Sequence, residues 1–298
     1  MAVTSVRHES EEMVLNAFAV AEPCAISELN QYHESEVFEF LAARPIHTVF
    51  MSSLIRDNGL VSPHNRGSFY ACRDRYGLLE GVALIGHATV IEARTDNSLA
   101  SFARVTSNCL NAHLIRGEQE TIKNFWKHYA SGGQEPRLIC TEMLFERRGP
   151  VPPVECVDDL RPATLSDLDK VMAVNATMAF EEGGTSPLQK DPSGFRRRTA
   201  RRIQQGRIWV WIQDNRLVFK ADVVGDTPEV TYLEGVHVHK EERRRGYGLR
   251  CLTSLSSILL GSSQSICLTI NERNKKALNF YEKAGFQFHS NYETIYLR

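Results

Sequence analysis

The segment 236–249 constrains the fold of this chain more than any other part of its sequence. A run typical of a β-strand, ending in Val-His-Val-His, leads into the pattern R-x-x-G-x-G at 243–248, and helix-forming residues follow. Glycines at 246 and 248 allow close approach of the backbone to a ligand. The free N–H groups at the start of a helix form an anion site, which neighbouring arginines strengthen with charge-assisted hydrogen bonds. The pattern predicts a pyrophosphate site at a strand-to-helix junction.

Strand and helix signals alternate around this junction in the order β-α-α-β-β-β-α-β-α-β. Alternating apolar runs predict the strands, at 154–161, 207–213, 218–224, 229–239, 265–270 and 292–297. Helical spacing and caps predict four helices. The first is capped at Thr164, and the other three cover 191–205, 246–260 and 274–284.

A second motif follows the first at a fixed distance. Residues 274–286 match N-x-x-A-x-x-x-Y-x-x-x-G-F through Asn274, Ala277, Tyr281, Gly285 and Phe286. Together the two motifs resemble those of the GNAT (Gcn5-related N-acetyltransferase) family. The resemblance implies an α/β fold of the α+β, mixed-sheet type, in which helices flank a mostly antiparallel sheet with a V-shaped splay.

The first half has a similar rhythm of strands and helices, which predicts two GNAT folds in tandem. The segments 180–187 and 219–222 also resemble a group of two-domain predicted acetyltransferases. The first half lacks both motifs, so we expect a degenerate copy that binds no acetyl-CoA. The expected domains are an N-terminal extension (1–24), a degenerate GNAT-like domain (25–146), a proline-rich linker (147–155) and a catalytic GNAT domain (156–298).

The resemblance implies acetyl-CoA, or a related acyl-CoA, as co-substrate and no metal. The residues expected to contact it lie on the fourth strand, the loop and the last helix: Val236, His237, Val238, Arg243, Arg244, Arg245, Gly246, Tyr247, Gly248, Leu249, Asn274, Ala277 and Tyr281. The contact of Val236 and Val238 would be through their backbone, so they are equally ordinary strand residues. Asn274 is also a good N-cap for its helix.

The expected chemistry uses two side chains. Tyr281 matches the family tyrosine that protonates the leaving thiolate, although the same ring could simply pack the helix on the sheet. Glu234 is the expected general base, since strand alternation places it on one face with Tyr232, Val236 and Val238. The same alternation puts His237 and His239 on the opposite face, as structural residues.

Two charged segments bear on the acceptor. Five arginines at 196–202 form either a solvated face or a cleft wall for an anionic substrate, and without interleaved aromatic residues they do not indicate nucleic-acid binding. Glu181 and Glu182 lie where GNAT proteins bind their acceptor. They would favour a cationic amine, unless they are only solvated loop residues.

The composition adds few constraints. The net charge is -1, and no apolar run is long enough to span a membrane, so we expect a cytoplasmic protein without nucleic-acid or membrane partners, as a monomer or homodimer. Seven scattered cysteines without C-x-x-C spacing indicate neither a disulfide framework nor a zinc site.

The sequence therefore predicts transfer of an acetyl or short acyl group to the primary amine of a small molecule or peptide, by direct attack in a ternary complex. Two alternatives remain open. One is an acyl-CoA-binding sensor without turnover. The other is an amino-acid N-acyltransferase that uses larger acyl groups, because residues 45–57 faintly resemble glycine N-acyltransferase-like proteins.

Overall fold

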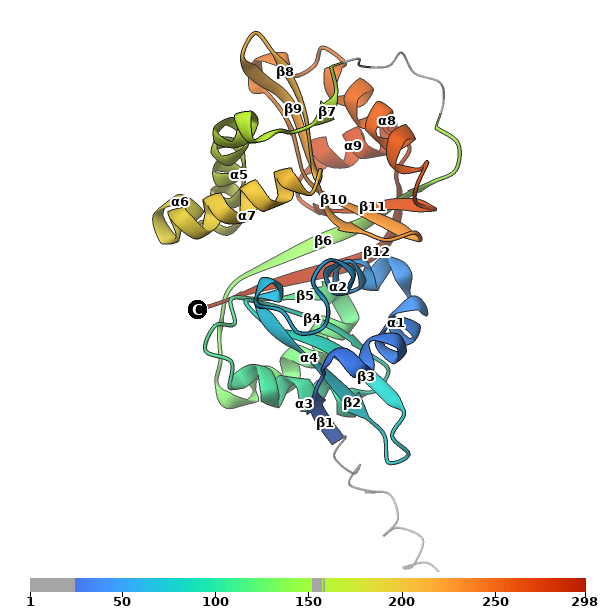
Figure 1. Ribbon diagram of the computed structural model, residues 1–298. Helices are drawn as coiled ribbons and strands as arrows, with labels where there is room; N and C mark the ends of the chain where they lie inside the picture. Colours follow the sequence, from blue (N-terminus) through green and yellow to red (C-terminus); the bar gives the residue numbers. More distant parts are fainter. Residues whose placement is uncertain (1–24, 152–156, 158) are drawn as a thin grey trace, which may run out of the picture.

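The computed structural model describes residues 25–151, 157 and 159–298. It shows two successive series of strands and helices, in the same order apart from one additional short helix, α6, in the second (Figure 1). The first series is β1 (Ala25–Glu28), α1 (Glu34–Ala42), α2 (Pro45–Asn58), β2 (Gly67–Arg73), β3 (Leu79–Gly86), β4 (Ala88–Ala93), α3 (Asp96–Ser107), β5 (Leu114–Glu118), α4 (Gln119–Tyr129) and β6 (Pro136–Arg148). The second is β7 (Arg161–Pro162), α5 (Leu168–Gly183), α6 (Pro187–Lys190), α7 (Pro192–Gln204), β8 (Ile208–Gln213), β9 (Arg216–Asp226), β10 (Val230–Val238), α8 (Tyr247–Leu259), β11 (Ser265–Asn271), α9 (Lys275–Lys283) and β12 (Gln287–Leu297).

Among the described residues, twelve strands form one continuous sheet, in the order β1-β2-β3-β4-β5-β12-β6-β11-β10-β9-β8-β7. The last strand of the chain, β12, is inserted between β5 and β6 of the first half. In turn β6 pairs with β11 of the second half. The two halves thus share β6 and β12, which cross the middle of the molecule in Figure 1.

The expected linker at 147–155 begins too early, because β6 extends to Arg148. Arg147 and Arg148 still belong to β6, and the Arg147 guanidinium donates to the carbonyl of Ala284. The strand expected at 154–161 is described only at its end, as β7. The rest of the linker at 152–156, residue 158 and the 1–24 extension lie outside the described residues.

Each half covers both faces of its part of the sheet with helices. In the second half α8 and α9 pack on one face around Leu252, Leu278 and Phe286, whereas α5 and α7 pack on the other around Val171 and Ile203. In the first half α3 and α4 cover one face, and α1 and α2 cover the other.

Helix α2 also joins the two halves. Its side chains Ile46 and Val49 pack against Tyr232 of β10 and Cys267 of β11, forming a separate apolar cluster between the halves. Burial of apolar surface on both sides of this contact stabilises one relative orientation of the halves.

The expected V-shaped splay is present. Strands β10 and β11 run parallel and pair only over Val230–Tyr232 and Ser265–Cys267, after which they separate. One edge of β10 beyond Tyr232 therefore has no neighbouring strand and can offer backbone groups to a ligand. Strands β4 and β5 of the first half part in the same way after three pairs. The mixed sheet, the splay and the flanking helices confirm the expected fold class.

Two expectations on bulk properties can be compared with the structure. Cys251 and Cys267 are buried and free, as small core residues, but Cys72 is disulfide-bonded, which corrects the expectation of no disulfide. None of the described helices combines the length and the apolar character that crossing a membrane requires.

Candidate active site

The loop between β10 and α8 presents backbone donors at the helix start. Gly246 is the N-cap of α8, with φ at 80°, and Arg244 also has a positive φ, at 64°. The first N–H of this helix bonded within the turn is that of Arg250, at 3.1 Å from the Gly246 oxygen. The N–H groups before it are free of the helical ladder. A Cβ at Gly246 would meet nothing within 4 Å, so the space beside the loop is open. The loop therefore has free N–H groups and open space for an anion, and its binding of a pyrophosphate stays a prediction.

Two of the three loop arginines are held by protein groups. Glu242, which is buried, accepts from Arg245 and from Arg216 of β9, each at 2.6 Å. Arg243 donates through Nε to the Val238 carbonyl at 3.0 Å. Within the described ranges the structure gives the Arg244 side chain neither a hydrogen bond nor an ion pair, so this guanidinium remains available to an anion.

Gly248 serves a different purpose from the one expected. A Cβ there would lie 2.8 Å from Val238 Cγ2 and 3.3 Å from the Phe280 ring, so the missing side chain lets α8 pack closely on β10 and α9. The ring of Tyr247 packs edge-on against Trp211, at 5.0 Å between centroids, and Leu249 packs against the core. The contacts of these side chains are therefore with the protein, and the backbone of the three residues remains the part expected to reach a ligand.

The second motif places one residue as a cap. Asn274 Oδ1 accepts the Ala277 N–H at 3.1 Å. Asn274 is therefore the N-cap of α9, which was the second of the two roles expected for it. Ala277 packs against the core of the second half beside Phe280 and Tyr281.

A β-bulge in β10 overturns the expected distribution of side chains. Glu234 lies opposite Asp222 and His237 lies opposite Lys220, so Gly235 and Val236 share one partner position on β9. The bulge depends on Gly235, whose φ is +59°. Because the extra residue reverses the alternation, Glu234 and His237 share one face of the sheet.

The valines follow the bulge to the other face. Val236 and Val238 pack against the core under α8 and α9, so neither shares a face with Glu234. The expectation that they do, and that His237 points away, is therefore wrong. His239 is structural, as expected, since its Nδ1 accepts the Glu241 N–H at 3.4 Å.

Glu234 takes part in a network that crosses the sheet from one half to the other. Arg116 of β5 donates to Glu234 Oε1 at 2.6 Å and also to Thr269 of β11. Tyr232 donates to the same Glu234 oxygen at 2.8 Å. The network continues through Glu142 of β6, which lies 3.6 Å from Arg116 Nε. The first half thus contributes Arg116 to the site, and no local pattern in the sequence indicates this.

The network lines an open space rather than a closed core. The side chains of Arg116 and Glu234 are 24% and 38% exposed, although protein surrounds both. Burial favours the neutral acid, but the charge of Arg116 and the hydrogen bonds from Arg116 and Tyr232 outweigh it and lower the pKa of Glu234. A carboxylate stabilised in this way is a poor proton acceptor.

Glu182, near the end of α5, has the opposite character. Its side chain is accessible to solvent but enclosed by protein, and this burial together with the Glu234 and Glu142 carboxylates raises the pKa of Glu182 to about 7. The structure gives it no hydrogen bond or ion pair within the described residues. A carboxyl group that titrates near neutral pH suits a general base.

A buried ion pair lies under the bulge. Lys220 Nζ donates to Asp222 Oδ1 at 2.7 Å, and the Lys220 side chain is fully buried. A Cβ on Gly235 would lie 2.9 Å from this Nζ. Burial and the charges of Arg243 and Lys220 lower the pKa of the neighbouring His237 to about 4, so its imidazole is neutral at neutral pH.

Tyr281 lies on α9 beside the core aromatic residues. Its ring contacts Phe280 and Phe286 at centroid distances of 5.1 and 5.8 Å. Burial and the nearby Glu182 raise the pKa of Tyr281 well above its ordinary value, so the phenol keeps its proton at neutral pH. No described residue makes a hydrogen bond with its hydroxyl. Tyr281 therefore offers a free donor near Glu182.

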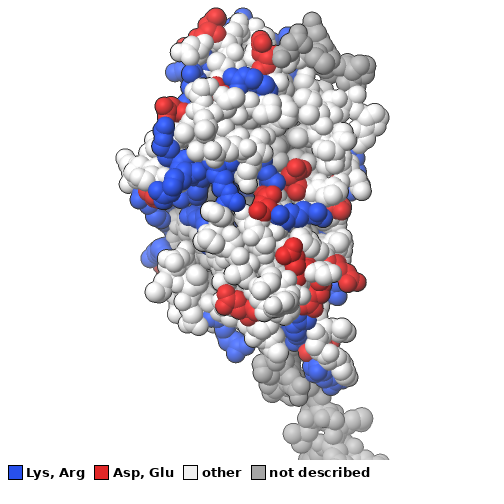
Figure 2. Space-filling model, viewed as in Figure 1, with Lys and Arg blue, Asp and Glu red and all other residues white. Residues whose placement is uncertain are grey.

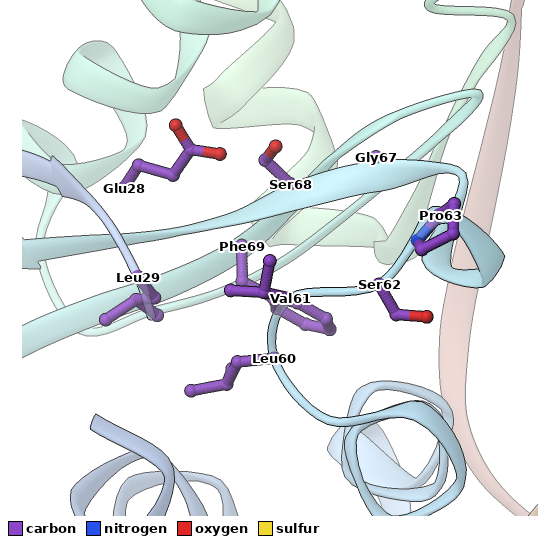
Figure 3. A pocket seen from close by; sticks show the side chains of 9 residues that line it. All are labelled: Glu28, Leu29, Leu60, Val61, Ser62, Pro63, Gly67, Ser68 and Phe69. Atoms are coloured by element: carbon purple, nitrogen blue, oxygen red, sulfur yellow. The ribbon is translucent and has the colours of Figure 1, made fainter. Parts of the chain in front are cut away.

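The equivalent junction in the first half cannot hold a pyrophosphate in this way. Only Arg94 and Thr95 separate β4 from α3, and the Thr95 hydroxyl caps the helix by accepting the Ser98 N–H at 3.3 Å. A hollow of about 380 Å³ in this half is bounded by Leu60, Pro63 and Phe69 among others (Figure 3), and none of its lining residues belongs to the site described above. The described residues hold no cluster of His, Cys, Asp or Glu suited to a metal.

Comparisons with known proteins bear on the same half as the loop. The family model described as FR47-like protein matches residues 225–295, from the end of β9 to β12. This match includes Glu234, the loop and Tyr281. No curated protein matches the chain.

Solved structures match over nearly the whole chain. A Drosophila protein has a TM-score of 0.65 at 12% identity and covers 92% of this chain and 99% of its own. A GCN5-related N-acetyltransferase from Sphaerobacter thermophilus reaches 0.57 at 12% identity, covering 92% and 95%. A tandem GNAT protein from the clavulanic acid biosynthesis pathway reaches 0.52 at 12% identity, covering 91% and 98%. The chain therefore has the tandem GNAT fold that was expected from its two sequence motifs and from the similar rhythm of its first half.

Proposed function

We propose that the chain transfers an acetyl or other short acyl group from its CoA thioester to a primary amine, by direct attack in a ternary complex. The observation that carries this proposal is the splay between β10 and β11, with an anion-binding loop at one end and Glu182 and Tyr281 beside it. The tandem GNAT fold supports it, because that fold includes acyltransferases among its solved members.

The residues for holding acetyl-CoA are present in this chain. The N–H groups of Tyr247 and Gly248 face the space beside Gly246, and Arg244 adds a free charge for the pyrophosphate. The unpaired edge of β10 from Leu233 to Val238 offers backbone groups along the splay. When bound, acetyl-CoA supplies an activated thioester carbonyl.

In this proposal the general base is Glu182 rather than Glu234. An amine attacks in its neutral form, and its nitrogen must release a proton as the C–N bond forms. A base with a pKa of about 7 can accept this proton effectively at neutral pH. Glu234 instead keeps Arg116 and Tyr232 in place through its two short hydrogen bonds. The unpaired N–H groups of β10 are suited to stabilising negative charge on the acyl oxygen.

Gly246→Val is expected to weaken acetyl-CoA binding by about 10–100-fold, because the side chain enters space meant for phosphate and removes charge-assisted hydrogen bonds. The measurement is the calorimetric Kd for acetyl-CoA. Gly77→Val is the matched control, since Gly77 has a φ of +84° and equally open space but lies in the first half. Equal losses of affinity in both variants would mean that backbone strain, and not the loop, causes the effect.

Tyr281→Phe is expected to lower kcat by about 10²-fold, since it removes the only proposed proton donor for the thiolate while keeping the ring. The Kd for acetyl-CoA should change little, because the ring contacts with Phe280 and Phe286 remain. Steady-state kinetics and calorimetry on the same preparation separate the two quantities. An unchanged kcat would remove Tyr281 from the role of acid.

The test of the function itself is release of free CoA thiol from acetyl-CoA across a panel of primary amines. Thiol release that depends on an added amine, with the acylated amine as product, supports the proposal. Tight binding of acetyl-CoA without turnover of any amine would favour the sensor. Faster reaction with benzoyl-CoA or phenylacetyl-CoA than with acetyl-CoA would favour amino-acid conjugation with larger acyl groups.

A further inference from the structure

A row of residues at the ends of four strands borders the region where the two halves meet. The His87 N–H donates to the Arg66 carbonyl at 2.9 Å, and the His113 N–H donates to the His87 carbonyl at 3.1 Å. The Leu297 N–H continues the row by donating to the His113 carbonyl at 2.8 Å. The rings of His87 and His113 stack at 5.0 Å, and His113 contacts the Tyr296 ring edge-on at 6.0 Å. These contacts fix the positions of the side chains along one border of the sheet.

Cations from the second half and from β6 join this row. Lys190 ends α6, Arg198 lies on α7, and Arg137 on β6 lies over the Tyr296 ring at 5.2 Å. Figure 2 shows Lys and Arg side chains gathered on the left of the molecule, at the level of α6 and α7. We call the six residues of the row and its neighbours the basic cluster: Arg66, His87, His113, Arg137, Lys190 and Arg198.

The positive charge of the basic cluster is poorly compensated. Among the described residues, Arg66 and Lys190 have no side-chain hydrogen bond or ion pair, and Arg137 donates only to the Gly183 carbonyl, at 2.9 Å. Arg198 is paired with Asp191 at 2.9 Å. Asp191 lies near Arg66 as well as Arg198, so it offsets part of the charge of the four cations, and the remaining positive surface attracts an anion.

Burial and the positive charge of the basic cluster lower the pKa values of its two histidines. Burial and the surrounding charges of Arg66, Lys190 and Arg198 lower the pKa of His87 to about 4. Burial and the charges of Lys190 and Arg137 also lower the pKa of His113. Neutral imidazoles can donate a hydrogen bond to an anion without adding to the repulsion between the cations.

The basic cluster is continuous with the proposed acceptor site. Arg137 and Tyr296 are the connection, because Arg137 binds the carbonyl of Gly183, the residue after Glu182. The Tyr296 ring also lies against Gly183, 3.5 Å from the position of a Cβ there. One surface therefore runs from an acidic end at Glu182 to a basic end at the row of strand termini.

We propose that the amine acceptor carries an anionic group, a carboxylate or a phosphate, which Arg66, Lys190 and Arg198 bind while the amine lies at Glu182. This inference rests on the proposed function and names its substrate class. The acidic end attracts the ammonium form before its proton is lost, and the basic end orients the remainder of the molecule.

The experiment compares pairs of amines that differ only in the anionic group: 6-aminohexanoate with hexylamine, and O-phosphoethanolamine with ethanolamine. In the wild type, kcat/KM for at least one anionic member should exceed that of its neutral partner by about tenfold or more. The pair that shows the advantage distinguishes a carboxylate from a phosphate. In Lys190→Gln and Arg66→Gln the advantage should disappear, while kcat/KM for the neutral amines stays unchanged.

Arg196→Gln is the matched control, because Arg196 lies on α7 but pairs with Asp169 at 2.6 Å, outside the basic cluster. Equal kcat/KM within both pairs, with turnover of neutral amines, would overturn the inference and leave the acyltransferase proposal intact. If no amine is turned over, the calorimetric Kd of 6-acetamidohexanoate and N-acetyl-O-phosphoethanolamine decides instead. Binding that weakens about tenfold in Lys190→Gln but not in Arg196→Gln supports the site, and equal or absent binding in all three proteins rejects it.

Discussion

Glu182→Gln is expected to lower kcat by about 10²–10⁴-fold, the range that a positioned general base contributes. Glutamine keeps the size and polarity of the side chain but cannot accept a proton. In the wild type, kcat/KM should rise with pH around 7, because only the deprotonated carboxylate is active and its pKa is about 7. This rise should be absent in the variant. An aromatic amine that is already neutral at pH 6 serves as acceptor, so that its own titration does not mask that of Glu182.

Glu181→Gln is the matched control, since Glu181 directly precedes Glu182 on α5. Its kcat and pH profile should remain those of the wild type. His237→Asn tests the alternative base, which is the His237 imidazole on the same face as Glu234. This imidazole has a pKa of about 4 and is neutral at neutral pH. If Glu182→Gln keeps its rate and pH profile while His237→Asn loses both, the base is His237 and the role proposed for Glu182 is wrong.

The sequence was sufficient for the features that depend on local backbone chemistry. The loop at 243–248 leads from a strand into α8, as the motif predicts. The order of strands and helices in both halves also follows from short-range periodicity, and the predicted bounds agree to within a few residues except at the ends of some strands. These features are encoded within a few residues of each other.

The sequence predicted the wrong face of the sheet for the side chains of β10 that follow Gly235. Alternation with a period of two holds only while every residue has one partner, and the bulge at Gly235 breaks this condition. An isolated glycine within a strand pattern is itself a signal for a bulge. Applied to Gly235, this signal predicts that His237 shares a face with Glu234.

The contribution of the first half had no local signal. Arg116 reaches Glu234 only because β12 is inserted between β5 and β6, which makes one sheet of the two halves. A strand has the same apolar periodicity whether it pairs within its own half or with the other half. Periodicity therefore cannot reveal that β12 is inserted into the first half. The lowered pKa of Glu234 follows from this long-range contact, and this lowered pKa is the reason why we propose Glu182 as the base.

Lys220→Met is expected to lower the free energy of unfolding by about 3–5 kcal/mol, the usual cost of leaving a buried charge without its partner. Lys220 is fully buried, and Asp222 is 5% exposed, so water cannot replace the lost ion pair at 2.7 Å. Urea unfolding followed by circular dichroism gives the change as a shift of midpoint at constant slope. The matched surface control is Lys123→Met, whose partner Glu120 lies at 3.3 Å in an exposed pair, and which should cost about 1 kcal/mol or less.

The double variant Lys220→Met/Asp222→Leu separates stability from function, because replacing both charges by apolar groups should restore most of the stability. The ion pair also lies directly under Gly235, where the bulge sets the direction of Glu234 and His237. If the pair fixes this bulge, the double variant should unfold near the wild-type midpoint but have a lower kcat. Wild-type kcat in a stable double variant would show that the backbone of Gly235 alone keeps the bulge. A double variant as unstable as Lys220→Met would instead mean that packing around the lysine stem, and not the unpaired carboxylate, causes the loss.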